Sequence, residues 1–424
     1  MKLRNLFLST LVVCAFSACT KDDDGIQVPV EPVDASISFA TTTLTQTKAV
    51  SDTEGKTKDT FVNELYAFIF KVPADESNVA NMTLVGWGKA DTKDGQSVTT
   101  INHIIIKVTP NSTDETKASA DVFKAVLVAN PGKSFSTSYA SLAALQEATL
   151  TNSIETYPFS KSPYLPMVSE VIDVKNIVPI IKGENGTTYN ENWISGDGKT
   201  VTKPSADDSN ITKPQDAGTI ELIRLVARVQ VEQIKSSIHD AYPGSSFELT
   251  NLSLVNVRPL ATMVDGKGNA TYEYVKGFES ENYELSDGWI YPDFTGGLIT
   301  DNYKKALSKE YDVTFSKENV SWEPDDNIKF YSYAFPNSSG GFQTALLITG
   351  IFKRNATDRD GEVKNFRVIL NDNEVIRNNV YKLIITLTGE GSSNEDKIEL
   401  NAHVSAQIEV ANWFVVDQTE TDVN

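Results

Sequence analysis

Apolar and polar residues alternate one by one in several stretches of the chain. Residues 381–387 read YKLIITL and residues 404–410 read VSAQIEV, so every second side chain is apolar. Because successive side chains of a strand point to opposite faces of a sheet, this period predicts strands with one buried face. Continuous apolar runs predict further, more deeply buried strands at residues 61–70, 101–108, 122–129, 220–231, 247–257, 329–335 and 344–352.

Turn residues separate these runs, as in Asn130-Pro131-Gly132 and Asp360-Gly361. One helix is predicted over residues 138–148, where leucines recur at helical spacing and a serine or threonine can cap the start. Without crossover helices, a parallel α/β sheet is disfavoured, and many short strands are typical of β-sandwiches. Residues 200–218 are rich in Pro, Asp, Ser, Thr and Lys and mark a domain boundary. We therefore predict an all-β protein of two tandem sandwich domains, with one short helix in the first.

The first residues have the features of an export signal. Lys2 and Arg4 precede an apolar run over residues 6–16, which is too short to span a bilayer as a helix. Residues 16–19 read FSAC and resemble the bacterial lipobox, with Phe16 in place of the usual Leu. This resemblance makes Cys19 the acylated first residue of a lipoprotein, a palmitate carrier; the alternative is plain secretion with a chance cysteine. The acidic run at 20–24 is either a solvated linker or a surface-export signal like that of Bacteroidetes lipoproteins.

Composition narrows the classes of function. The net charge of −19 at pH 7 repels phosphate backbones and anionic headgroups, so we expect no nucleic-acid partner. Cys14 leaves with the signal and Cys19 is acylated, so the mature domains contain no disulfide. His103, His239 and His403 are too widely spaced for a zinc or iron site, and neither GxSxG nor GxxxxGK[ST] occurs. We therefore expect no enzyme, no cofactor and no metal site.

Several segments together resemble the Bacteroidales fimbrillins, the major subunits of pili that are assembled from lipoprotein precursors. Besides FSAC, the segments are QTKAV at 46–50, FVNELYAFIF at 61–70, VFKAVLVANPG at 122–132, ELIRLVARVQV at 221–231, LTNLSLVNVRPL at 249–260, FYSYAFPN at 330–337, VIRNNVYKLIITLTGEG at 375–391 and VANWFVVDQ at 410–418. Their order and spacing carry the resemblance over most of the chain. It implies two transthyretin-like β-sandwiches, no enzymatic activity, and assembly by proteolysis and strand exchange.

In this family a trypsin-like protease removes the first strand of the precursor. The matching site here is Lys48, followed by Ala49, where the best-known members have Arg. The removed piece contains the extended segment Ala35–Leu44, in which Ile37 and Phe39 alternate with serines and are expected to fill a groove. The alternative is that Lys48 is an unprocessed loop lysine. The predicted parts are a signal peptide at 1–18, a lipidated propeptide with the removable strand at 19–48, an N-terminal domain at 49–217 and a C-terminal domain at 218–424.

The resemblance also implies a donor strand from the C-terminus. The candidate residues are Trp413, Phe414, Val415 and Val416, whereas residues 417–424 (DQTETDVN) contain a single apolar residue. A donor needs alternate apolar side chains over about five residues, so this tail is a weak plug. For Trp413, a core or rim position at the end of the last strand is the alternative.

The predicted function is that of a structural subunit of a surface pilus that supports cell adhesion. Its expected partners are other copies of itself and other pilus subunits by strand exchange, the processing protease, and the outer membrane through the precursor's lipid. We expect an outer-membrane lipoprotein precursor that becomes part of a cell-surface fimbrium. The alternatives are an accessory, anchor or tip subunit, or a surface glycan-binding lipoprotein whose platform includes Tyr331, Tyr333 and Phe335.

Overall fold

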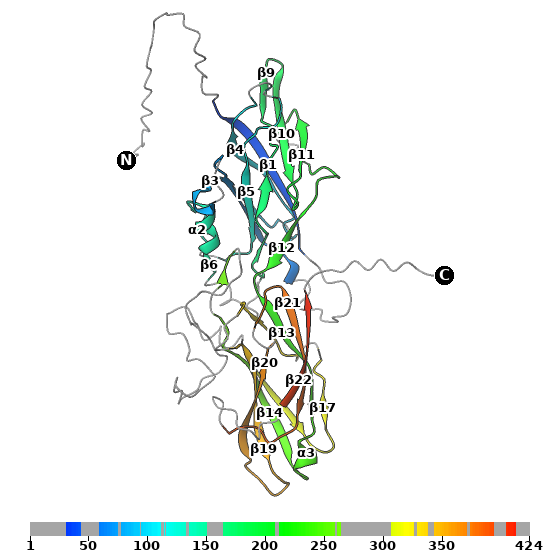
Figure 1. Cartoon of the computed structure of the whole chain (residues 1–424). Helices are drawn as coiled ribbons and strands as arrows, with labels where there is room; N and C mark the ends of the chain where they lie inside the picture. The colour runs from blue at the N-terminus through cyan, green and yellow to red at the C-terminus, as the bar shows by residue number, and fades with distance from the viewer. Residues whose placement is uncertain are drawn as a thin grey trace, which may run out of the picture.

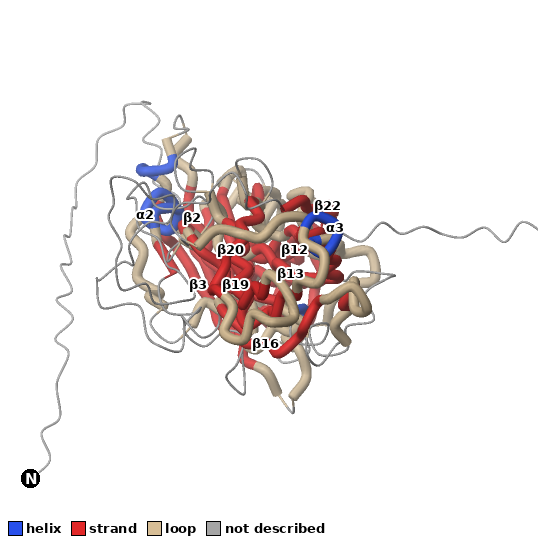
Figure 2. The backbone as a smooth tube through the Cα atoms, turned by 90° about the horizontal axis from the view of Figure 1, so that it is seen from below, coloured by secondary structure: helices blue, strands red, loops and turns tan. Residues whose placement is uncertain are grey.

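The protein is built almost entirely of strands, in two halves that lie end to end (Figure 1). The computed structural model describes residues 31–43, 59–74, 78–93, 95–111, 114, 116–132, 135–150, 164–207, 212–258, 261–263, 307–325, 329–337, 343–370, 374–393 and 404–412. Viewed along the long axis, strands fill the centre, and loops and the two helices lie at the periphery (Figure 2). The predicted all-β class is confirmed.

Among the described residues, twelve strands precede the junction between the halves. They are β1 (Val33–Thr43), β2 (Glu64–Lys71), β3 (Thr83–Asp91), β4 (Thr100–Val108), β5 (Phe123–Ala129), β6 (Thr149–Leu150), β7 (Met167–Val168), β8 (Ile172–Val174), β9 (Ile181–Gly183), β10 (Gly186–Ile194), β11 (Thr200–Ser205) and β12 (Ile220–Arg224). All except β6 form one hydrogen-bonded sheet in the order β11-β10-β1-β12-β7-β5-β2-β3, with β4 paired to β1, β8 to β5 and β9 to β10. β1 therefore occupies an interior position in this sheet.

The described residues of the C-terminal half form two main sheets. Its strands are β13 (Ala227–Ser236), β14 (Ser246–Val255), β15 (Ala261–Thr262), β16 (Ser308–Phe315), β17 (Ser321–Trp322), β18 (Tyr331–Ala334), β19 (Ala345–Lys353), β20 (Glu362–Ile369), β21 (Asn379–Leu387) and β22 (Val404–Asn412). One sheet has the order β17-β13-β21-β22 with β18 paired to β13, and the other has the order β16-β14-β19-β20. β15 instead pairs with β6 of the other half. β22 thus lies at the edge of its sheet.

The predicted helix is shorter than its apolar spacing suggested. α2 covers Leu142–Glu147, and the hydroxyl of Ser141 caps it by accepting a hydrogen bond from the Ala144 N–H at 3.2 Å. Leu142 and Leu145 are its buried residues, as the spacing predicts. A second short helix, α3 (Ile238–Ala241), follows β13, and a 3₁₀ turn covers Val79–Asn81. Within the described residues, no helix has the length and apolar character needed to cross a membrane.

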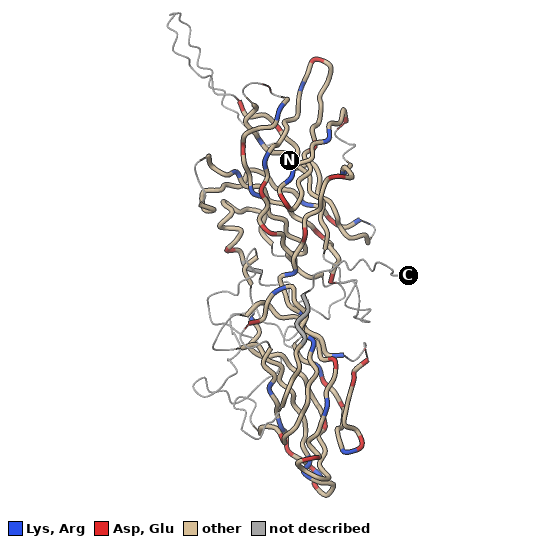
Figure 3. Tube along the Cα trace, turned by 45° about the vertical axis from the view of Figure 1, so that its right-hand side comes forward, with Lys and Arg blue, Asp and Glu red and all other residues tan. Residues whose placement is uncertain are grey.

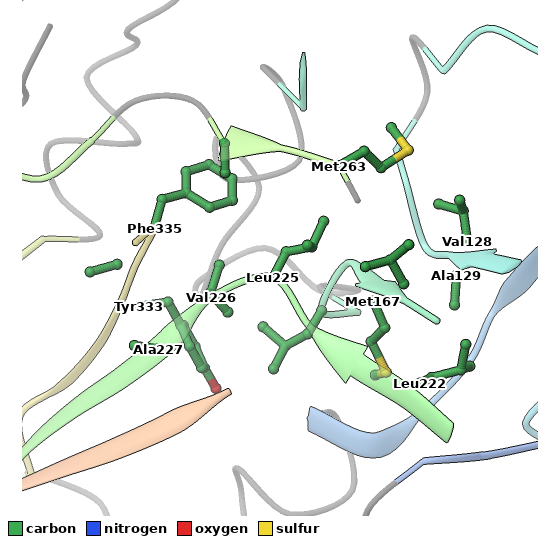
Figure 4. Close-up of a cluster of buried hydrophobic side chains, with 14 of the residues drawn as sticks. Val128, Ala129, Met167, Leu222, Leu225, Val226, Ala227, Met263, Tyr333 and Phe335 are labelled. Carbon is green, nitrogen blue, oxygen red and sulfur yellow. The ribbon is translucent and has the colours of Figure 1, made fainter. Parts of the chain in front are cut away.

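The apolar run at 220–231 forms two strands, one in each half. β12 pairs with β1 and β7 in the N-terminal sheet, whereas β13 pairs with β17, β18 and β21. Leu225 and Val226 connect them and are buried in a cluster with Met167, Tyr333 and Phe335 (Figure 4). The N-terminal sheet therefore continues through β12, which follows the predicted boundary between residues 217 and 218; that boundary stays a prediction. Because the link between β12 and β13 is itself apolar, no polar linker marks the change of sheet.

Candidate strand-exchange groove

β1 has hydrogen-bonded neighbours along both of its edges (Figure 1). β4 runs antiparallel to residues 33–40 of β1. On the other edge, β10 runs parallel to residues 36–39 and β12 runs parallel to residues 41–43. If β1 is removed, two rows of unpaired backbone groups face a single gap, which is the geometry that captures an added strand.

One face of β1 belongs to the main hydrophobic core. Ala35, Ile37 and Phe39 each have 0% exposure and lie in the large core cluster. Full burial of a large apolar side chain stabilises a fold by about 1.5–3 kcal/mol. Ile37 and Phe39 therefore contribute strongly to holding β1 in the sheet. Removal of β1 opens an apolar groove.

The opposite face of β1 is polar and equally buried. Ser36 donates a hydrogen bond to Oε2 of Glu191 at 2.6 Å, and Ser38 donates one to Oε1 at 2.5 Å. Glu191 is opposite Ser36 in β10 and is 3% exposed. Both carboxylate oxygens of a buried acid are thus satisfied by hydroxyl groups of β1.

β4 has a β-bulge beside the same two serines. His103 has a φ of 61°, rare for a residue other than glycine, and the register between β1 and β4 shifts between Ile37 and Phe39. The backbone N–H of His103 donates to Oγ of Ser38 at 3.1 Å, and its Nδ1 lies 3.0 Å from Oγ of Ser36. Each serine therefore contacts the strands on both sides of β1.

A second buried polar cluster surrounds Asp59, the first described residue after β1. Oδ2 of Asp59 accepts a hydrogen bond from Arg228 at 3.1 Å, Oδ1 accepts one from Tyr333 at 2.5 Å, and the Asp59 carbonyl accepts one from Arg224 at 2.8 Å. Burial raises the pKa of Asp59, and the nearby guanidinium of Arg228 opposes this rise. Burial also lowers the pKa of Arg224 to about 10. The cluster joins the chain that follows β1 to β13 and β18.

Most of the N-terminal half matches the model of a known protein family. Residues 35–224 match the family model described as major fimbrial subunit protein (FimA). The match begins within β1 and ends at Arg224, the last residue of β12, so the matched residues coincide with the N-terminal sheet.

Solved structures share the fimbrial fold over both halves. A fimbrilin of Porphyromonas gingivalis W83 has a TM-score of 0.57 and 17% identity, and the match covers 92% of this chain and 100% of that one. A protein of Parabacteroides distasonis ATCC 8503 described as a cell adhesion protein has a TM-score of 0.57 and 16% identity, with 90% and 100% covered. Identities this low show a shared fold. No curated protein matches the chain.

The resemblance to fimbrillins is therefore confirmed, while the predicted processing sites stay predictions. The structure places Ile37 and Phe39 in β1, on the buried apolar face. Cys19, Lys48 and Ala49 lie outside the described residues. So does the candidate donor segment, which is Trp413, Phe414, Val415 and Val416 and directly follows β22.

The sequence alone did not reveal the partners of these buried polar side chains. Ser36 and Glu191 are 155 positions apart, and Arg228 and Asp59 are 169 positions apart. A serine in a strand and an acid in a strand each look like solvent-facing residues when read locally. Only their pairing across the sheet shows that they are buried together.

Other candidate chemistry receives no support from the described part of the chain. Tyr333 is 5% exposed and Phe335 is 0% exposed, so the proposed aromatic platform with Tyr331 does not form. The alternating aromatic residues around β18 pack inward because this strand lies against β13 in the core. Among the described residues, no group of His, Cys, Asp or Glu is arranged to hold a metal ion. Acidic and basic positions are spread over both halves (Figure 3).

Proposed function

We propose that this protein is a structural subunit of a surface pilus, made as a lipoprotein, trimmed by a trypsin-like protease and polymerised by strand exchange, and that the pilus supports adhesion. The fimbrial family match supports the class of function. The observation that carries the mechanism is the interior position of β1, with β4 along one edge and β10 and β12 along the other. Loss of β1 creates an acceptor for a strand of another subunit.

The proposed cleavage site lies in the segment that connects β1 to the rest of the fold. β1 ends at Thr43, Lys48 follows it, and the described chain resumes at Asp59. Hydrolysis after Lys48 therefore leaves β1 held only by non-covalent contacts. The Asp59 cluster keeps the new N-terminal region attached to the C-terminal half after β1 leaves.

The proposed anchor and donor lie at opposite ends of the sequence. Cys19 precedes β1, so the same cut that releases β1 also separates the subunit from its lipid and from the outer membrane. The donor, Trp413–Val416, continues from β22 at the edge of a C-terminal sheet. A subunit would thus accept a strand in its N-terminal half and donate one from beyond its C-terminal half.

The test is to identify the N-terminus of protein sheared from the cell surface by mass spectrometry. We expect Ala49 as the first residue, and we expect Lys48→Ala to abolish that start and the detergent-resistant ladders of polymerised subunits. Lys56→Ala is the matched control and should leave both unchanged. A lipidated Cys19 as the sole start in the wild-type protein would overturn the polymerising role.

A lipidated Cys19 as the sole start would instead support the second candidate function, an accessory, anchor or tip subunit that keeps its first strand. The observation that favours it is the composition of residues 417–424, which contain one apolar residue and make a poor plug. An anchor subunit would be recovered with the cell envelope as a lipidated monomer bound to one filament end. Immunogold labelling distinguishes this pattern from a label repeated along the filament.

A further inference from the structure

We propose that Glu191 selects the strand that enters the groove of β1. The selected strand carries two hydroxyl-bearing residues, Ser or Thr, at alternate positions on one face and apolar residues on the other. We further infer that it comes from a different pilus subunit rather than from Trp413–Val416 of a second copy of this chain. The inference rests on the proposed strand exchange and names the partner strand by its chemistry.

The requirement for hydroxyl groups follows from the burial of Glu191. The carboxylate is 3% exposed, and its two oxygens accept hydrogen bonds from Ser36 and Ser38 at 2.6 and 2.5 Å. An entering strand that covers Glu191 again removes its water. If that strand has apolar residues at these two positions, the carboxylate loses both hydroxyl donors and keeps Nδ1 of His103, 3.6 Å from Oε2, as a neighbour on one oxygen. Losing hydrogen bonds is costly for a buried charged group.

β4 restricts the same two positions from the other side. The backbone N–H of His103 donates to Ser38, and Nδ1 of His103 lies 3.0 Å from Oγ of Ser36. A hydroxyl group can donate to Glu191 and accept from His103 at the same time, which an ammonium or an aliphatic group cannot do. A carboxylate in the entering strand would lie against Glu191 and repel it. The pair of positions therefore favours small hydroxyl residues.

The chain's own candidate donor does not meet this requirement. In Trp413–Val416 both faces are apolar, so either register places apolar side chains opposite Glu191. Thr419 and Thr421 do supply hydroxyl groups at alternate positions. The other face of that stretch is Gln418, Glu420 and Asp422, which cannot fill the space left by Ala35, Ile37 and Phe39.

Peptide exchange into the cut protein tests the selection. A lysine-specific protease first cuts the full chain between β1 and Asp59. Synthetic peptides are then added to displace β1, and native mass spectrometry measures how much of each peptide is bound. The peptides are residues 33–43, the same peptide with Ser36→Ala and Ser38→Ala, and residues 411–421 as the chain's own tail. Each charge-assisted hydrogen bond is worth about tenfold, so the doubly substituted peptide should bind about a hundredfold more weakly than the first. The tail peptide should not displace β1 at concentrations at which the first peptide does.

The matched control is the variant Glu191→Leu, in which the preference between the two peptides should be reversed. In Glu191→Leu the carboxylate is replaced by an apolar side chain, so the doubly substituted peptide should now bind better than the peptide with both serines. Replacing both partners of a hydrogen bond by apolar groups changes the free energy of the interaction little. Equal binding of the two peptides to the wild-type protein, or binding of the tail peptide as tightly as residues 33–43, overturns the proposal.

The uncut chain separates this proposal from the proposed function. Ser36→Ala with Ser38→Ala, Glu191→Leu, and the triple variant are compared by urea unfolding, and the triple variant should be more stable than the double serine variant. If this recovery occurs but no peptide exchanges into the cut protein, strand exchange is wrong and the selection of an entering strand falls with it, while the need of Glu191 for hydroxyl partners within β1 stands. If no recovery occurs, the selection itself is wrong, whether or not peptides exchange.

Discussion

At the scale of single residues, Asp59 has the most consequential position after β1. It is 4% exposed and contacts Arg228 and Tyr333 across the junction between the halves. Replacement by an asparagine keeps the size of the side chain but leaves Arg228 without a buried counter-charge. Breaking one side of a buried ion pair typically costs about 3–5 kcal/mol.

We therefore expect Asp59→Asn to lower the free energy of unfolding by about 3 kcal/mol or more, measured by urea denaturation. The control is Asp34→Asn in β1, where Asp34 pairs with Lys107 at 2.7 Å and the two side chains are 36% and 64% exposed. Exposed pairs contribute about 0–1 kcal/mol, so this variant should remain close to wild type. Similar losses in the two variants would show that the Asp59 cluster does not join the halves.

The burial of single residues was predictable from the sequence only where apolar and polar residues alternate along a strand. Ile37 and Phe39 alternate with serines, and both are buried as that alternation predicts. Glu191 and Asp59 were missed because their partners lie on distant strands. A pairing that depends on the topology of a sheet leaves no local pattern around either residue.

At the scale of elements, the apolar runs located most strands, and tertiary context decided their ends. The run at 329–335 contains β18 at Tyr331–Ala334, and the run at 344–352 contains β19 at Ala345–Lys353. The single run at 220–231 became β12 and β13 because Leu225 and Val226, between the strands, are as apolar and buried as the strands themselves. Hydrophobicity alone therefore cannot show where the chain leaves one sheet for another.

Close packing of β3 against β4 gives a test at this scale. A Cβ placed on Gly86 would lie 2.6 Å from Cγ2 of Ile106, a side chain that is itself 2% exposed. We expect Gly86→Ala to lower the free energy of unfolding by about 1–3 kcal/mol through overpacking, measured by urea denaturation. Gly183→Ala in β9 is the control, since its nearest neighbour would be at an ordinary 3.6 Å. A neutral Gly86→Ala would mean that β3 and β4 can separate at little cost.

At the scale of the whole molecule, a single core continues through the junction. The largest cluster of buried side chains includes residues of both halves, and Leu225, Val226, Met263 and Phe335 lie where they meet (Figure 4). The sequence predicted two tandem domains, and polar linkers usually separate such domains. Here the link is buried, so the halves are expected to respond to destabilisation as one unit.

Hydrogen exchange can test this coupling with substitutions far from the junction. Ile106 in β4 is 2% exposed and pairs with Ala35 near the start of β1, whereas the opposite end of β1 pairs with β12 at the junction. Ile106→Ala removes core contacts of the N-terminal half at a cost of about 2–5 kcal/mol. If the halves unfold together, amides of β21 should lose as much protection as amides of β5, and Leu249→Ala in β14 should produce the same pattern in reverse. Loss of protection confined to the substituted half would show that the halves unfold independently. In the proposed filament, a subunit that unfolds as one unit would transmit tension between the two halves through the buried junction, whereas independent halves would make that junction the weak point.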